Sequence, residues 1–297
     1  MKTAHIIPVA GAMIALAVSL QAQPSAHYAP GVEGIKAATL PPPGVYFRDY
    51  NYFYWADQLN DSHGNKIGPA DLDAFTYVNL PRVLWITETK FLGGYVGVDG
   101  FLPLVYQQAS ANTPNGPFSG NTFGIGDLFV EGSLSWHLKQ FDFSLASGFD
   151  APTGDSPSQP GPSTTPGLGY WTFMQTAGAT WYVDEAKTWA VSALNRLELN
   201  TEQSDTHITY GDAYTLEWGI SKSVCKEADL GVVGYYQQQL TGDSNGQPLN
   251  RVAAIGPEVS FFIPPQMLFI SLRYNYEFMA ESRAQGNNIT LTLTKRF

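Results

Sequence analysis

The residues of this chain best suited to covalent chemistry are its histidines and its single cysteine. A hydrolase would need His27, His63, His137 or His207 as the base for a serine nucleophile, with a polar side chain orienting the base. No spacing between a histidine and a serine resembles that of a lipase strand, and only His137 falls in a segment with clear strand periodicity. We therefore expect no catalytic residue and no enzyme. Cys225 is expected to be a free thiol in a short turn, with an intermolecular disulfide as the alternative.

Two further motifs could in principle bind a metal ion or a nucleotide. Residues 60–65, Asn-Asp-Ser-His-Gly-Asn, are rich in oxygen ligands but lack the spaced acids and closing Glu of a helix-loop-helix calcium site. Asn, Asp and Gly are also the residues that tight turns require, which favours a turn. Gly124-x-Gly126 has no following helix to present to a phosphate. We expect neither a metal nor a cofactor.

The composition excludes several classes of protein. The 297 residues include 16 Lys and Arg against 26 Asp and Glu, and the net charge of −10 argues against a nucleic-acid partner. Only 14% of residues are charged while 13% are aromatic, and soluble domains carry about 25% charged residues. The mean hydropathy is −0.13, and beyond the N-terminus no apolar run reaches the ~18 residues of a spanning helix. A helical membrane protein is excluded, whereas a membrane β-barrel is not.

The N-terminus has the pattern of an exported leader. Lys2 supplies the positive charge, residues 6–20 form the apolar region, and Ala22 marks a plausible cleavage point. We expect residues 1–22 to be a cleaved signal peptide, with a short membrane anchor as the alternative. Residues 23–43, which end in three prolines, are expected to lie in the periplasm or in the lumen of a barrel formed by residues 44–297.

Alternation of apolar and polar residues continues to the end of the chain. In residues 127–138 and 268–278 one face is apolar and the other carries the polar side chains, as in a strand whose neighbours point to opposite faces. The same period predicts about twelve strands. They are expected near residues 44–56, 74–88, 94–107, 124–138, 141–151, 169–183, 188–200, 209–222, 229–240, 250–263, 266–280 and 288–297.

The connections between these strands alternate in length. Those near 57–73, 108–123, 152–168, 201–208, 241–249 and 281–287 are long, and those near 89–93, 139–140, 184–187, 223–228 and 264–265 are short. Outer-membrane barrels have short periplasmic turns and long outer loops, and closure pairs every backbone group in the lipid. The sequence therefore predicts an all-β, antiparallel, up-and-down transmembrane barrel in the outer membrane, with both termini in the periplasm.

The strand ends and the C-terminus support a membrane location. Aromatic residues concentrate at strand ends, for example Tyr54 with Trp55 and Trp181 with Tyr182, as the two girdles of a barrel require. The chain ends in Phe297, which resembles the terminal signal of proteins inserted into bacterial outer membranes. The expected partners are therefore outer-membrane lipid, the outer-membrane assembly machinery through Phe297, and a small-molecule solute.

The face of the strands that should line the lumen carries more acids than bases, together with several rings. Such a mixture favours cations or neutral solutes over anions and offers weak stacking contacts to small aromatic molecules. Simple filling of a narrow barrel is the alternative. Arg273 could pair with Glu131 or Glu277 as a structural strut. The candidate passage residues are Asp99, Phe101, Asp127, Phe129, Glu131, Arg196, Glu217, Tyr235, Glu258, Arg273 and Glu277.

Three segments resemble a known family. They are residues 34–44, which lead into a Tyr-rich first strand, Gly-Ile-Gly-Asp at 124–127, and Phe-Asp-Ala-Pro-Thr-Gly-Asp at 149–155. The chain is similar over nearly all of its mature length to the outer-membrane proteins associated with the meta-pathway of phenol degradation. The resemblance implies an outer-membrane location and uptake of small compounds, aromatic ones among them, but no established binding residue.

We therefore expect a barrel for passive uptake of small hydrophobic or aromatic compounds, without a covalent step. The alternatives are a structural or partner-binding barrel that transports nothing and an outer-membrane lipid hydrolase. A hydrolase would need a histidine within ~3 Å of a serine hydroxyl at the hydrophobic boundary.

Overall fold

The computed structural model describes residues 26–68, 71–113 and 116–297. None of the helices in these ranges is long and apolar enough to cross a membrane. The described residues form strands joined by turns and loops, with one short 3-10 helix at Pro264–Gln266. The strands are β1 Gly44–Leu59, β2 Asp73–Phe91, β3 Gly94–Phe101, β4 Leu104–Thr113, β5 Gly116–Ile125, β6 Leu128–His137, β7 Phe141–Ala151, β8 Thr172–Tyr182, β9 Trp189–Asn200, β10 Ala213–Cys225, β11 Ala228–Gln239, β12 Arg251–Ile263, β13 Leu268–Glu281 and β14 Ala284–Arg296.

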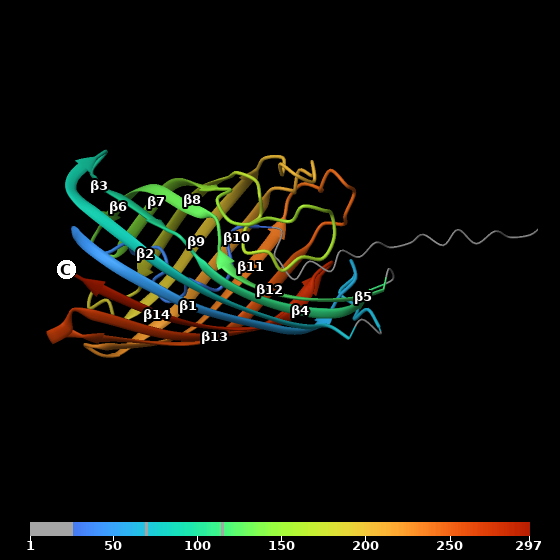
Figure 1. The fold of residues 1–297 in the computed structure, drawn as a ribbon. Helices are drawn as coiled ribbons and strands as arrows, with labels where there is room; N and C mark the ends of the chain where they lie inside the picture. The colour runs from blue at the N-terminus through green and yellow to red at the C-terminus, as the bar shows by residue number, and fades with distance from the viewer. Residues whose placement is uncertain (1–25, 69–70, 114–115) are drawn as a thin grey trace, which may run out of the picture.

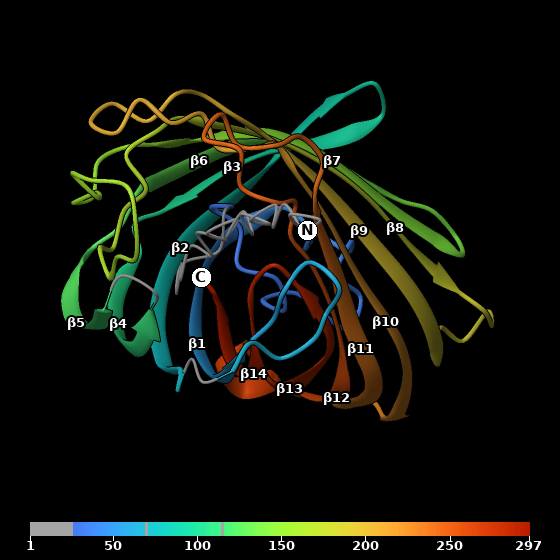
Figure 2. The same ribbon diagram turned by 90° about the vertical axis from the view of Figure 1, so that its right-hand side faces the viewer.

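These strands close into one antiparallel barrel, which Figures 1 and 2 show from the side and along its axis. The ring closes because β1 pairs with both β2 and β14. The long strand β2 pairs with β3 along its second half and with β4 along its first half. β3 in turn pairs with β6, and β4 with β5. β3 and β4 therefore share one position around the ring, and β5 and β6 share the next. The described strands thus make a barrel of twelve positions, which confirms the predicted fold class.

The prediction of one outer loop is wrong. Residues 108–123 were predicted to be a loop, but most of them belong to the β4–β5 hairpin, which extends the barrel wall at the end of the long loops. The wall breaks where Gly126 donates its N–H to the Pro103 carbonyl at 2.8 Å. A Cβ at Gly126 would lie 2.7 Å from Cγ of Pro103, so a larger residue does not fit at this break. The interruption explains why β5 pairs with β4 alone while β6 goes on to pair with β7.

The two faces of each strand differ as the alternation requires. On β7, Asp142 and Ser144 are buried inside the barrel, whereas Phe141, Phe143 and Leu145 are exposed on its outer surface. An outer surface of large apolar side chains would be unfavourable in water, and it fits the hydrocarbon region of a bilayer. The polar inner face therefore lines the lumen.

The C-terminus lies at the end of the barrel that carries the short turns, where Phe297 donates its N–H to the Val45 carbonyl at 3.0 Å. The start of β1 lies at the same end. Residues 26–43 run inside the ring of strands, as the blue segment in Figure 2 shows. Residues 1–25 lie outside the described residues, so the predicted signal peptide and residues 23–25 are not placed.

Candidate functional site: the lumen

Residues 26–43, here called the lumen segment, are held by carboxylates of the barrel wall. The segment has almost no regular structure, so its buried backbone N–H groups need acceptors from elsewhere. Three inward-facing glutamates on β9, β10 and β12 provide them, and hydrogen bonds to charged groups are the strong ones. The pairs are Tyr28 N to Glu198 at 3.0 Å, Gly31 N and Glu33 N to Glu217 at 2.8 and 3.0 Å, and Ile35 N to Glu258 at 2.8 Å.

The wall also donates hydrogen bonds to the carbonyls of the lumen segment. Gln237 contacts the Tyr28 carbonyl at 3.1 Å, and Thr290 contacts the Gly31 carbonyl at 3.0 Å. Gly31 has a φ of +92°, and a Cβ there would lie 3.0 Å from side-chain atoms of three wall residues. Glycine is needed at this point because both the backbone conformation and the space exclude a side chain. The lumen segment is therefore fixed between residues 28 and 35 by side chains of β9, β10, β11, β12 and β14.

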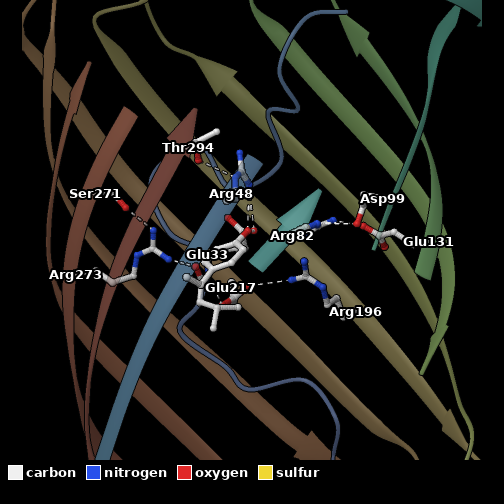
Figure 3. Close-up of polar contacts among 12 residues, drawn as sticks. Glu33, Arg48, Arg82, Asp99, Glu131, Arg196, Glu217, Ser271, Arg273 and Thr294 are labelled. Carbon is white, nitrogen blue, oxygen red and sulfur yellow. Dashed lines mark hydrogen bonds and ion pairs between the residues drawn. The ribbon is translucent and has the colours of Figure 1, made fainter. Parts of the chain in front are cut away.

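A set of ion pairs, most of them buried, lies around the lumen at the level of Glu33, as Figure 3 shows. We call it the charged belt: Arg48, Arg82, Arg196 and Arg273 with Glu33, Asp99, Glu131, Glu217 and Glu258. Its N···O contacts are Arg82 to Asp99 at 2.7 Å and to Glu131 at 2.6 Å, Arg196 to Glu217 at 3.0 Å, Arg273 to Glu258 at 3.1 Å, and Arg48 to Glu33 at 3.5 Å. Buried charges of this kind are stable only when they are paired, so removing one partner leaves a costly charge behind.

The predicted partner of Arg273 is wrong. Arg273 pairs with Glu258 and not with Glu131 or Glu277. Glu258 and Arg273 lie directly opposite each other on β12 and β13. Counting outward from the short turn between these two strands would have placed them together, because a tight hairpin fixes its register.

Two cavities lie on either side of the charged belt. The first, the loop-side chamber, has a volume of about 190 Å³ and is lined by residues 26–33 and by rings that include Tyr50, Tyr52, Phe101 and Phe129. The second, the turn-side chamber, has about 490 Å³ and is lined by residues 35–42 with a more basic wall. Both are lined by the same four belt side chains, Glu33, Arg82, Glu131 and Arg196. The belt and the lumen segment together therefore form the boundary between the chambers.

The predicted passage residues all lie on the inner side of the barrel, but they divide into groups. Phe101, Asp127, Phe129 and Glu277 line the loop-side chamber, Glu258 and Arg273 line the turn-side chamber, and Glu131 and Arg196 line both. Asp99, Glu217 and Tyr235 line neither cavity. They hold lining residues in place: Asp99 pairs with Arg82, Glu217 with Arg196, and Tyr235 donates a hydrogen bond to Glu277 at 2.8 Å.

Asp127 has a structural role in addition to its place on the chamber wall. Its carboxylate accepts hydrogen bonds from the N–H of Gly154 at 2.9 Å and of Leu168 at 2.7 Å, and it contacts the His27 ring at 3.0 Å. These contacts join β6, the 152–171 loop and the lumen segment. The Gly-x-Gly-Asp and Ala-Pro-Thr-Gly-Asp motifs thus meet, because Gly154 belongs to the second of them.

Sequence reasoning missed two arginines of the belt, Arg48 and Arg82. On β2, Leu84 and Ile86 are buried on the same face as Arg82, while Val83 and Trp85 are exposed on the other. Both faces of this strand are apolar over that stretch, so its period did not show which side met the lumen. Arg82 itself, a charge in an apolar run, was the signal that could have identified the inner face.

The described residues do not assemble a hydrolase site around the predicted strand histidine. Nδ1 of His137 lies 3.0 Å from Asp142, with no serine hydroxyl in contact. Ser62 and His63 are neighbours 3.4 Å apart in an exposed loop, away from the outer apolar band. His27 contacts the hydroxyl of Thr172 at 2.7 Å inside the barrel.

The loop at residues 60–65 is a turn. Oδ1 of Asp61 accepts hydrogen bonds from the N–H groups of His63 at 2.8 Å and Asn65 at 2.9 Å. The bond from Asn65, with that from His63, holds the pKa of the Asp61 carboxyl below its usual value. No group of three or more acids, histidines or cysteines suited to a metal ion occurs within the described ranges.

Comparison with known families shows to which of them the chain belongs. Residues 56–293 match the model of the family described as "Putative MetA-pathway of phenol degradation". The chain belongs to this family. No curated protein matches it in sequence.

Among solved structures, the COG4313 outer membrane channel from Pseudomonas putida F1 aligns with a TM-score of 0.74 at 15% identity, over 91% of this chain and 100% of that one. This likeness shows that the two proteins share a fold. The KdgM porin aligns at 0.45 with 10% identity over 85% of this chain and 99% of its own. The TodX monoaromatic hydrocarbon channel aligns at 0.46 with 9% identity over 86% and 91%. Both scores are too low to relate those architectures to this one.

Proposed function

We propose that this protein is an outer-membrane channel for passive movement of small hydrophobic or aromatic compounds. The observation that carries the proposal is the ring-lined loop-side chamber inside a closed barrel with an apolar outer surface. Membership of a family named for phenol degradation and a fold shared with an outer-membrane channel add support. The movement needs no covalent step and no cofactor.

The solute would contact the chamber side chains in turn. Rings such as Phe101 and Phe129 give weak, reversible stacking and apolar contact, which suits a passage because tight binding would slow release. The charged belt then limits what goes further. A solute would have to pass Glu33, its partner Arg48 and the other arginines of the charged belt, so we expect the lumen segment to limit the rate.

The test is reconstitution of the purified protein. In planar bilayers we expect a small ion conductance that is interrupted when benzyl alcohol is added, because the solute and the ions share one route. In outer-membrane vesicles with a lipopolysaccharide leaflet we expect uptake of labelled benzyl alcohol to exceed that of vesicles without the protein. Absence of both conductance and added uptake would count decisively against the proposal.

A barrel that transports nothing is the second candidate, and one observation favours it. The lumen segment is hydrogen-bonded to several strands, and the ion pairs of the charged belt lie on the wall around it. The same current recordings separate the two. A wild-type barrel that never conducts, beside a variant without residues 26–43 that does, would indicate a permanently closed structural barrel.

We propose that residues 1–22 direct export of the chain to the outer membrane and are then cleaved. We also propose that both termini and the short turns face the periplasm. The clustering of the short turns and the C-terminus at one end supports this orientation. Cys225 is exposed near one of these turns and is the only cysteine. A membrane-impermeant maleimide should label it only after the outer membrane is permeabilised, and labelling of intact cells would reverse the orientation.

We further propose that the assembly machinery recognises Phe297. Its side chain is 76% exposed while its N–H pairs with β1, so the ring is free to contact a partner. Phe297→Ala should lower the amount of folded barrel in the outer membrane, measured by heat-modifiable migration on gels. The conservative Phe297→Tyr should retain most of it.

A further inference from the structure

Asp150, at the end of β7, is a buried carboxylate with an unused oxygen. Asp150 is only 4% exposed, and it lines the loop-side chamber. Its Oδ2 has no hydrogen-bond partner among the described residues. An unpaired buried carboxylate oxygen is unfavourable, and a ligand that donates a hydrogen bond to it would remove that cost. The residue belongs to the motif at 149–155, whose role the channel function leaves unexplained.

The strand register places two rings beside this carboxylate. Asp150 lies opposite Phe129 of β6, and Phe129 lies opposite Phe101 of β3, so the three side chains adjoin on the inner face. The two rings stack with centroids 4.9 Å apart and planes at 26°. The wall of the chamber thus offers a carboxylate and an aromatic surface next to each other.

The basic side chains near Asp150 already have hydrogen-bond or ion-pair partners. Both ring nitrogens of His27 have partners, Thr172 at 2.7 Å and Asp127 at 3.0 Å. Arg82 is bound by Asp99 and Glu131, and Arg196 by Glu217. Within the described residues, no basic nitrogen lies within 4.0 Å of the Asp150 carboxylate as an ion-pair partner. Oδ2 of Asp150 is therefore free to accept a hydrogen bond from a ligand.

The other charges of the chamber also favour a cation. Its lining contains five acids, Glu33, Asp127, Glu131, Asp150 and Glu277, and three arginines, Arg82, Arg196 and Arg283. The excess of acids attracts positive solutes and repels negative ones. A ring also attracts a cation placed over its face, which adds to the carboxylate contact.

We infer that Asp150, Phe129 and Phe101 form a binding site for a protonated amine that carries one aromatic ring. The ammonium group would donate to Oδ2 of Asp150, and the ring would lie against the two phenylalanines. The volume agrees, because a cavity of about 150 Å³ admits a benzene ring and this chamber has about 190 Å³. The inference rests on the proposed function in one respect, namely that small solutes enter this chamber.

The test measures binding to the full-length protein in detergent micelles by calorimetry at pH 7, with benzylammonium chloride and its neutral analogue benzyl alcohol. Wild type should bind benzylammonium about tenfold more tightly than benzyl alcohol, as a hydrogen bond between charged groups predicts. Asp150→Asn should lower the affinity for benzylammonium about tenfold and keep the affinity for benzyl alcohol within about twofold of the wild-type value. Asp155→Asn is the matched control, because it removes one charge from an exposed residue of the adjoining loop and should change neither affinity.

Three results would overturn the inference: equal wild-type affinities for the two probes, no benzylammonium binding, or equal affinity for benzylammonium in wild type and Asp150→Asn. If the Asn variant fails to fold, the wild-type comparison and Asp150→Glu, which keeps the charge and should keep the preference, still decide. Failure here is distinct from failure of the proposed channel. Uptake of benzyl alcohol by vesicles without any amine preference would reject this site alone, whereas amine binding without conductance or uptake would reject the channel alone.

Discussion

The guanidinium of Arg196 lies 4.0 Å from the centre of the Tyr28 ring, which joins the barrel wall to the lumen segment. Glu217 completes this contact, because it pairs with Arg196 at 3.0 Å and also accepts the Tyr28 hydroxyl and the N–H groups of Gly31 and Glu33. One wall carboxylate therefore serves both the belt and the segment. Its removal should affect stability and closure together.

Glu217→Ala should destabilise the barrel by about 3–5 kcal/mol, because it leaves Arg196 buried without its partner and two backbone N–H groups without an acceptor. Chemical unfolding in detergent measures the change. Glu185→Ala is the matched control, since Glu185 pairs with Lys139 in an exposed bridge whose side chains are 75% and 76% exposed. It should produce no measurable change. Equal effects of the two substitutions would contradict the assignment of Glu217 as the central anchor.

Removal of residues 26–43, with Ser25 joined directly to Gly44, should raise single-channel conductance at least severalfold. The segment lines both chambers and fills the space between them, so its loss should merge them into one water-filled passage. Planar-bilayer recordings of wild type and variant at the same salt concentration provide the comparison. An unchanged conductance would show that the side chains of the wall, and not the segment, form the narrowest point.

The fold followed from the sequence where one strand face meets lipid and the other meets the lumen. On β7, for example, the expected bounds of 141–151 equal the observed ones. The β4–β5 hairpin was missed because its residues, Gln, Ala, Ser, Asn, Pro and Gly among them, are also those of loops. A hairpin that extends past the apolar band does not need an apolar face, so the period that marks the other strands is weak there.

The sequence predicted which side chains face the lumen but not which groups they contact. Polarity placed Glu217 and Glu258 inside the barrel, and burial agrees. Their main role, to accept N–H groups of residues 31–35, depends on where the N-terminal segment runs, and no local pattern of the sequence encodes that path. Asp150 was missed for a different reason: within the motif at 149–155 it resembled an ordinary residue at the start of a turn.

Arg82→Gln should make the lumen more selective for cations. Arg82 is bound to both Asp99 and Glu131, so its loss leaves two acids with one fewer counter-charge at the boundary between the chambers. We expect the ratio of cation to anion permeability to rise by on the order of severalfold, as judged from the reversal potential across a salt gradient. Arg251→Gln removes the same charge from a pair with Glu281 at the exposed strand end, and it should leave the ratio near that of wild type. A larger shift from Arg251 than from Arg82 would refute the belt as the selective region.

Asp184, in the short turn between β8 and β9, should make stability depend on pH in the acid range. Its carboxylate accepts the N–H of Trp189 at 2.8 Å and the hydroxyl of Thr188 at 2.9 Å, and the Trp189 bond in particular holds the pKa of Asp184 below its usual value. A carboxyl whose pKa is lower in the folded than in the unfolded state adds stability above its unfolded pKa of about 3.9 and loses that contribution as the pH falls through the folded pKa. Asp184→Asn should therefore lower the unfolding temperature at pH 7, and the difference from wild type should shrink below about pH 4. Asp205→Asn, at an exposed loop residue, is the control for the change in net charge. A difference for Asp184→Asn that stays constant from pH 7 to pH 3 would show that the amide perturbs the turn for reasons other than charge.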